Sequence, residues 1–309
     1  MRPRVPVPGE THVRHTADRR PPHRPPRRRH PAFRGRIGRD ARSGHYAVPG
    51  RYRLHLSTAC PQGLGVAVVH GLLGIGESCP VTVLPAVPDG PDGGHAVLRP
   101  LYEASAHRHP GPALAPVLSD DWSGRIVSTH APDIARDLDR HFGDGRAALY
   151  PCAEEAAIEA VERLCAQEVE DAAQRAGEAD AAPAHRAEAL GVLLGALDVL
   201  ERRLTDRDHV AGHGLTGADV TLWVTLVQLD LVHRHHLDAR AVHRIADHPA
   251  LWDHARRLTA LPAFRAALDP AGIARRHRAH CRGLEAAGAA VQILDWAAHA
   301  DGTHRLHRP

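Results

Sequence analysis

Cys60 is the residue whose position most clearly suggests chemistry. Residues 51–56 alternate polar and apolar side chains, as a half-buried strand does, and Pro61 then introduces the apolar run 64–73, which predicts a helix. At a helix start, unpaired backbone amides and the positive end of the dipole face the capping residue. That position favours the thiolate by lowering the pKa of a cysteine. We therefore predict that Cys60 is a nucleophile, with an inert, packed cysteine as the alternative.

The other cysteines do not form a redox pair with Cys60. Position 63 is Gly63, so there is no Cys-x-x-Cys motif and the site can support only a single-thiol mechanism. The chain has five cysteines, an odd and widely spaced set, which argues against a disulfide framework and favours reduced thiols in a cytoplasm. Cys79, Cys152 and Cys165 are expected to be small buried residues.

Histidines are abundant, and some of them cluster in the sequence. His277 and Cys281 are four residues apart, so they could share a helix face and hold zinc. However, 26 histidines in one chain produce such pairs by chance, and no carboxylate-containing motif accompanies them. We therefore predict no metal site. The clustered histidines are His233, His235, His236, His277 and His280.

The segments after the first helix complete a small α/β layout. Glycines at 71, 74 and 76 follow that helix and indicate its end rather than a phosphate loop. A strand is expected at 81–84, and a long loop with one short helix at 85–113. Residues 115–118 and 125–127 flank a turn sequence and predict a hairpin, followed by an amphipathic helix over 132–142. The order βαβ and then ββα is thioredoxin-like.

The second half of the chain is expected to be helical. Residues 153–176 and 184–204 place apolar side chains at three- and four-residue spacing. Thr216 and Asp219 predict a capping box in front of the apolar run 220–232. The fold class is therefore an α/β thioredoxin-like N-terminal domain followed by an all-α C-terminal domain.

Charge and composition divide the chain into three parts. Residues 1–45 are rich in Arg, Pro and His with little to bury, so we expect a disordered basic leader. The thiol-binding domain is placed at 46–148 and the helical domain at 149–309. The formal net charge is +3, but the basic excess lies in the leader, so we expect no nucleic-acid binding by the mildly acidic remainder.

Membrane insertion and export are not expected. No stretch of 18 or more apolar residues occurs, which excludes a spanning helix. The arginines of the leader are followed by prolines rather than by an apolar signal segment. These features predict a cytoplasmic protein with no membrane partner.

The motifs and their order resemble the glutathione transferase superfamily, and in particular its glutathionyl-hydroquinone reductases, the Xi class. The resemblance extends from about residue 33 to near the C-terminus. The segments that support it are Pro49–Tyr52, Ala59–Pro61, Ala115–Leu118, Leu215–Asp219, Leu222, Asp230, Arg244–Trp252 and Leu294–Trp296 with His299.

The resemblance implies a reaction and a set of site residues. The Cys60 thiolate would attack the sulfur of a thiol-conjugated hydroquinone and release the hydroquinone. A second thiol would then regenerate the Cys60 thiolate. Glutathione or another low-molecular-weight thiol would be the co-substrate, with no bound cofactor, and the protein would be a homodimer. Pro116 is expected to follow a cis bond that presents the backbone of Ala115 to the thiol peptide. Residues implied in thiol binding are Pro61, Gln62, Ala115, Pro116, His130 and Ala131.

Several anchors of the family are replaced in this sequence. Gln62 takes the place of a tryptophan, Pro112 of an arginine, and His130–Ala131 of a Glu-Ser pair that grips the γ-glutamyl group. Each lost charge-assisted hydrogen bond would weaken binding by about 1.5–3 kcal/mol. Either another thiol is used, or the protein is a degenerate scaffold that binds ligands or partners without turnover. The family also uses tyrosines of the helical domain to orient the hydroquinone. The matching positions of this chain hold other residues, namely Gln174, His233–Arg234 and the region near His277–Arg278.

Overall fold

The first half of the chain is built on a four-stranded sheet with the strand order β2-β1-β3-β4. The computed structural model describes residues 33–143, 148–281 and 292–296. Strand β1 pairs in parallel with β2 and antiparallel with β3, which in turn pairs antiparallel with β4. This is the topology predicted for a thioredoxin-like half. The strands are β1 (Tyr52–Leu56), β2 (Val81–Val83), β3 (Val117–Asp120) and β4 (Arg125–Ser128).

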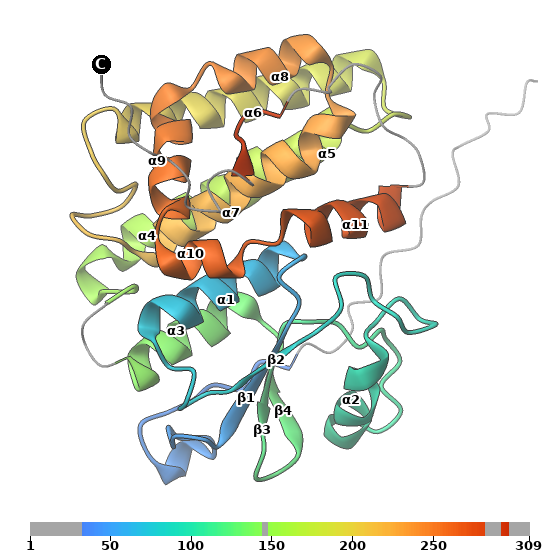
Figure 1. Cartoon of the computed structure of the whole chain (residues 1–309), viewed down its shortest axis with the longest axis vertical. Coiled ribbons are helices and arrows are strands. Elements are labelled where there is room, and N and C mark those ends of the chain that lie inside the picture. Colours follow the sequence, from blue (N-terminus) through green and yellow to red (C-terminus); the bar gives the residue numbers. More distant parts are fainter. Residues whose placement is uncertain (1–32, 144–147, 282–291, 297–309) are drawn as a thin grey trace, which may run out of the picture. The chain divides into compact units, whose positions relative to one another are not determined.

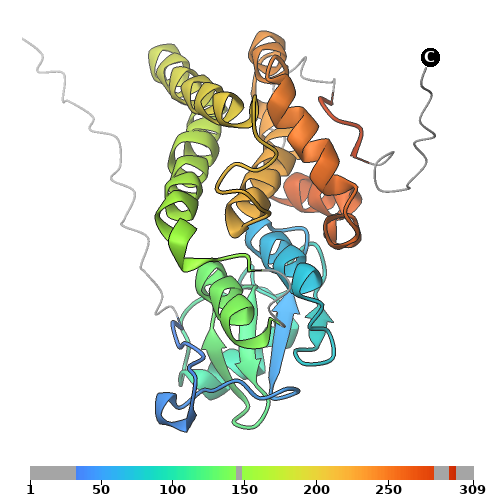
Figure 2. The ribbon, with the colours of Figure 1, turned by 90° about the vertical axis from the view of Figure 1, so that its left-hand side faces the viewer.

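Helices cover both faces of this sheet (Figure 1). Helices α1 (Pro61–Leu73) and α3 (Ala131–Phe142) pack against each other on one face, and Figure 2 shows them side by side. Leu118 belongs to the core on that side, whereas its neighbour Val117 packs with the smaller core beside α2 (Arg99–Ser105). The alternation of apolar side chains along β3 therefore places a helix layer on each face.

Residues 33–45 are part of this fold, which corrects the predicted end of the leader. Arg36 donates to Asp137 at 2.6 Å, and Ile37 is buried in the main core. The amide of Gly35 donates to the Val127 carbonyl of β4 at 2.9 Å, so this segment lies along the sheet. These partners are about 100 positions away in the sequence, which is why local composition did not reveal them. The predicted disorder of residues 1–32 lies outside the described residues.

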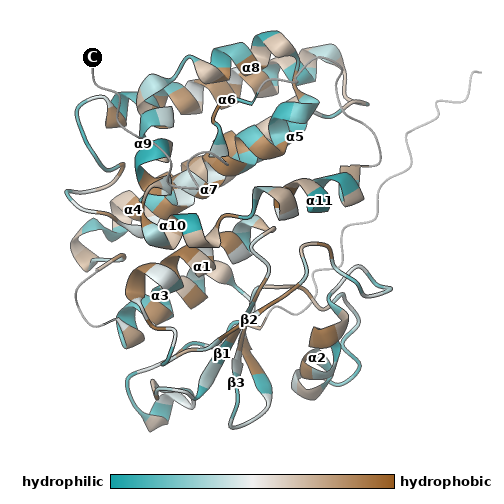
Figure 3. Cartoon of the chain, viewed as in Figure 1, coloured by the Kyte–Doolittle hydropathy of each residue, from teal (hydrophilic) through white to brown (hydrophobic). Residues whose placement is uncertain are grey.

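The second half is helical, as predicted. Helix α1 packs against α7 and α10, and the described residues fall within one compact unit that spans 32–309. In Figure 3, the ribbon carries hydrophilic residues along parts of α5 and α11. The helices are α4 (Glu155–Leu164), a π-helical turn (Cys165–Glu170), α5 (Asp171–Ala176), α6 (Pro183–Leu204), α7 (Gly217–Leu231), the 3-10 helix η5 (His233–His236), α8 (Ala239–Ala246), α9 (Pro249–Thr259), α10 (Pro262–Ala267) and α11 (Pro270–Cys281).

Three shorter 3-10 helices complete the element order. They are η1 (Ala41–Ser43), η2 (Ala96–Leu98) and η3 (Cys152–Glu154). None of the helices in the described ranges is long and apolar enough to cross a membrane.

Helix boundaries follow the predicted local signals. Gly74 ends α1 with a φ of 65°, a left-handed conformation that favours glycine, so the glycines here terminate a helix. The capping box forms at the start of α7, where the carboxylate of Asp219 accepts from the Thr216 amide at 2.9 Å. This contact fixes the start of the buried central helix of the second half.

Candidate active site

Cys60 caps the N-terminus of α1, where the sequence placed it. Its Sγ accepts a hydrogen bond from the Gly63 amide at 3.3 Å and donates one to the Ser57 carbonyl at 3.2 Å. A Cβ at Gly63 would lie 2.2 Å from the Ser57 oxygen and 3.0 Å from the sulfur. Glycine is therefore required at this position for the first turn to close around the thiol.

The predicted lowering of the Cys60 pKa is wrong, because burial of the thiol outweighs the effects that favour its ionised form. Burial raises the pKa of this thiol above its ordinary value and outweighs the opposing effects of the Gly63 amide and the Arg276 charge. Only 5% of the Cys60 surface is exposed. The helix-start argument identified the hydrogen bond that stabilises the thiolate, but it did not include the desolvation that opposes it.

Arg276 is a site residue that sequence reasoning missed. It lies on α11, more than 200 residues after Cys60, and its Nη1 donates to the Ala86 carbonyl at 3.3 Å. Its charge lowers the pKa of Cys60 and also that of His95, which burial already lowers. Arg276 is thus a cation whose charge acts on the Cys60 thiol, and nothing in the local sequence indicates that the fold brings it near.

This arrangement predicts a pH profile. Because the thiol pKa is raised, alkylation of Cys60 by iodoacetamide should keep accelerating above the pH at which an ordinary cysteine is fully ionised. Arg276→Gln removes a favourable charge, so it should raise the pKa further and slow alkylation severalfold at pH 8. Arg275→Gln is the matched control, since Arg275 faces Asp269 at 3.7 Å instead. Equal rates for the two variants would contradict the assignment of Arg276.

The bond between Ala115 and Pro116 is cis, as predicted. Within the described part of the chain, neither the amide nor the carbonyl of Ala115 makes a hydrogen bond. These two groups are therefore available to an added extended peptide. Ala115 and Pro116 do not line the cavities described below.

His130 occupies the N-terminal cap of α3, where its Nδ1 accepts from the Asp133 amide at 3.4 Å. Burial alone would raise the pKa of Asp133, but the hydrogen bond from Arg34 and the charges of His130 and Arg36 hold it below its ordinary value. The helix start therefore already carries a paired carboxylate. The paired carboxylate leaves less positive potential at this helix start for an anionic group of a ligand.

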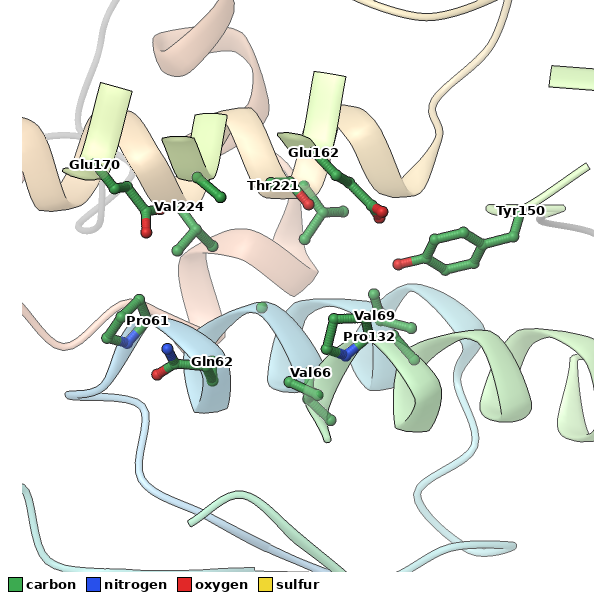
Figure 4. A pocket seen from close by; sticks show the side chains of 15 residues that line it. Pro61, Gln62, Val66, Val69, Pro132, Tyr150, Glu162, Glu170, Thr221 and Val224 are labelled. Atoms are coloured by element: carbon green, nitrogen blue, oxygen red, sulfur yellow. The ribbon is translucent and has the colours of Figure 1, made fainter. Parts of the chain in front are cut away.

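A cavity of about 250 Å³ brings together Pro61, Gln62 and Ala131 between the two halves of the structure. Its floor comes from α1 and α3 and is largely aliphatic, and the helical half covers it (Figure 4). A neighbouring hollow is lined by His130 and shares Pro132 with this cavity. The structure thus places four of the predicted thiol-binding residues along one continuous surface.

Two carboxylates enter this cavity from the helices above it, as Figure 4 shows. Glu162 accepts from Arg136 at 2.7 Å, and Glu170 accepts from the Thr225 hydroxyl at 2.9 Å. Burial raises the pKa of Glu170. Neither residue was predicted, because each lies on a helix whose sequence reads as an ordinary amphipathic segment. Together they provide acceptors for an amino group of a ligand.

A second cavity, of about 560 Å³, lies among α5, η5 and α11. Its lining includes Gln174, His233 and His277, which lie at or near the positions where the resemblance implies hydroquinone-orienting tyrosines. The fold therefore assembles these positions as the resemblance implies, but with imidazole and amide groups in place of phenols.

The remaining cysteines are all unpaired thiols. Cys79 and Cys165 are fully buried, as predicted, and burial raises the pKa of each to about 12. The prediction for Cys152 is wrong, because it is exposed at the start of the short helix that leads into α4. Its flanking residues carried no signal for that exposure.

Comparison with known proteins identifies the family. Residues 183–257 match the glutathione S-transferase C-terminal domain. The glutathionyl-hydroquinone reductase PcpF of Sphingobium chlorophenolicum is 30% identical over 72% of this chain and 75% of its own length.

Solved structures agree with this match. A Xi-class glutathione transferase from Natrialba magadii superposes with a TM-score of 0.74 at 25% identity, covering 83% of this chain and 84% of that chain. The glutathione-bound structure of YqjG from Escherichia coli K-12 superposes with a TM-score of 0.71 at 26% identity, covering 81% of this chain and 89% of that chain. With a thiol at the start of α1, a cis-proline strand and this helical half, the chain belongs to the glutathionyl-hydroquinone reductases of the glutathione transferase superfamily.

Proposed function

We propose that the protein reduces thiol-conjugated hydroquinones with Cys60 as the attacking group. The Cys60 thiolate forms a disulfide bond with the thioether sulfur, and the bond between that sulfur and the ring carbon breaks. The ring carbon keeps the electron pair and takes up a proton, which releases the hydroquinone. A second thiol then attacks the mixed disulfide, forms a small-molecule disulfide and restores the Cys60 thiolate.

The observation that supports this proposal most directly is the contact of the Cys60 sulfur with the Gly63 amide. This backbone donor, 3.3 Å from Sγ, stabilises negative charge on the sulfur both before attack and when the enzyme thiolate leaves the mixed disulfide. Arg276 adds a positive charge to the same environment. The reaction class is that named for PcpF and YqjG.

The co-substrate in this proposal is glutathione or another low-molecular-weight thiol. Glutathione is the ligand named for the YqjG structure. In this chain, Glu162 and Glu170 could receive the amino group of such a thiol, since both line the cavity that begins at Pro61 and Gln62. His130 and Ala131 provide fewer hydrogen bonds to a γ-glutamyl group than a Glu-Ser pair does, so we expect weak glutathione binding.

We also propose a cytoplasmic homodimer, following the family. Unpaired buried thiols at Cys79 and Cys165 suit a reducing compartment. Size-exclusion chromatography with light scattering would test the dimer, and a monomer at all concentrations would contradict it.

Turnover of menadione conjugates tests the proposed reaction. Conjugates made with glutathione and with cysteine should each be mixed with the enzyme and the matching thiol, and the released menadiol measured by chromatography. We expect release with at least one thiol, and calorimetry should show which thiol binds more tightly. Binding of a thiol without turnover of either conjugate would contradict the reductase function and favour a ligand-binding scaffold.

A further inference from the structure

Three side chains of metal-ligating type meet at one edge of the second cavity. His236 ends η5, and His277 and Cys281 lie one turn apart on α11. The Nε2 atoms of the two histidines are 2.8 Å apart, and the Cys281 sulfur is 3.9 Å from Nε2 of His236. All three ligand atoms lie within 4.8 Å of one another. Sequence spacing linked only His277 with Cys281, and the fold adds His236.

We propose that His236, His277 and Cys281 bind a zinc ion that ties η5 to α11. Tetrahedral zinc, with Zn–N of about 2.05 Å and Zn–S of about 2.3 Å, needs roughly 3.3 Å between two nitrogens and roughly 3.6 Å between nitrogen and sulfur. The present separations of 2.8 Å and 3.9 Å lie within about half an ångström of these values. The remaining pair, His277 and Cys281, lies within 4.8 Å, so closing the site also requires the Cys281 sulfur to approach His277 by up to about 1.2 Å through side-chain rotation.

The surroundings favour a divalent cation. The cavity beside the three residues is lined by three carboxylates and one guanidinium, so its wall carries an excess of negative charge; these residues are Asp171, Glu178, Asp180 and Arg175. Its volume of about 560 Å³ leaves space for water at the fourth coordination position. The ring of His235 stacks on that of His277 at 5.3 Å and holds the ligand ring in orientation. Three protein ligands of N and S type with water at the fourth position are the arrangement of an open zinc site, whereas a purely structural site has four protein ligands.

Zinc binding would replace the proton of the Cys281 thiol with a Zn–S bond and release that proton to solvent. No change of oxidation state is involved.

Cobalt and zinc titrations test the site on the full chain, without a histidine tag and after treatment with a chelator. We expect one equivalent of Co²⁺ to produce the charge-transfer absorption of a cobalt–thiolate bond, and one equivalent of Zn²⁺ to abolish it. Cys281→Ser should remove that absorption. His236→Gln and His277→Gln should each weaken binding more than about 100-fold, because loss of a direct ligand exceeds the 10–100-fold cost of losing an outer-shell partner.

Matched controls separate this site from the other histidines and cysteines. Cys152→Ser removes an exposed thiol, and His243→Gln removes an exposed imidazole on α8, so both should bind cobalt as the wild type does. Thermal unfolding of each metal-free variant would show whether it folds. Absence of thiolate absorption in the wild type, its persistence in Cys281→Ser, or weak binding of several equivalents by scattered histidines only would overturn the proposal. Because this test does not measure turnover, it is independent of the proposed reaction.

Discussion

Cys60→Ser is expected to lower turnover of a thiol-conjugated hydroquinone at least about 1,000-fold, because a serine hydroxyl stays protonated where a thiol can ionise and cannot form the mixed disulfide. The substitution is nearly isosteric and keeps an acceptor for the Gly63 amide, so the start of α1 should remain intact. Turnover should be compared in the assay that releases menadiol. Unfolding midpoints of the two proteins should agree, which would assign the loss to chemistry.

Cys152→Ser is the matched control for that experiment, because Cys152 is an exposed thiol away from α1. Mass spectrometry of the wild type after one turnover without a second thiol should show a single thiol adduct, located on Cys60. Retained activity in Cys60→Ser, or an adduct on Cys152, would contradict the assignment of the nucleophile.

The features that could be predicted from the sequence are those determined within a few residues. The start of α1 at Pro61, its end at Gly74 and the capping box at Thr216 all depend on local backbone chemistry, and all appear in the structure. The cis bond at Pro116 followed from the family resemblance rather than from spacing. These elements were sufficient to place Cys60 at its helix start.

The features that could not be predicted depend on contacts between distant segments. The burial of Cys60 raises the pKa of its thiol and the charge of Arg276 opposes that rise, and Arg276 lies on a helix near the far end of the chain. His236 meets His277 across 41 positions, and no periodicity connects η5 with α11. For the same reason, the sequence did not predict the ion pairs of Arg34 and Arg36 with α3. These arginines lie in a segment whose composition is that of a solvated tail, and their partners are distant in the sequence.

A buried carboxylate, Asp230 of α7, connects the second half to the late segment 292–296. Its oxygens accept from the amides of Ile293 and Leu294 at 2.9 and 3.0 Å, and from the indole of Trp296 at 2.8 Å. Nε of Arg234, itself buried, lies 3.3 Å from the same carboxylate. Trp296 is fully buried and packs edge-on against Trp223. One side chain therefore satisfies three donors that would otherwise be buried without an acceptor.

Asp230→Ala should lower the free energy of unfolding by about 3–5 kcal/mol, because it removes those three hydrogen bonds and the carboxylate beside a buried guanidinium. Urea unfolding followed by tryptophan fluorescence would measure the change. Asp238→Ala is the comparison, since the carboxylate of Asp238 accepts only the Ala241 amide at the exposed start of α8, and loss of such a cap costs about 1 kcal/mol. Equal destabilisation by the two variants would mean that the 292–296 segment contributes little. A larger loss for Asp230→Ala would show that this segment is an integral part of the helical core.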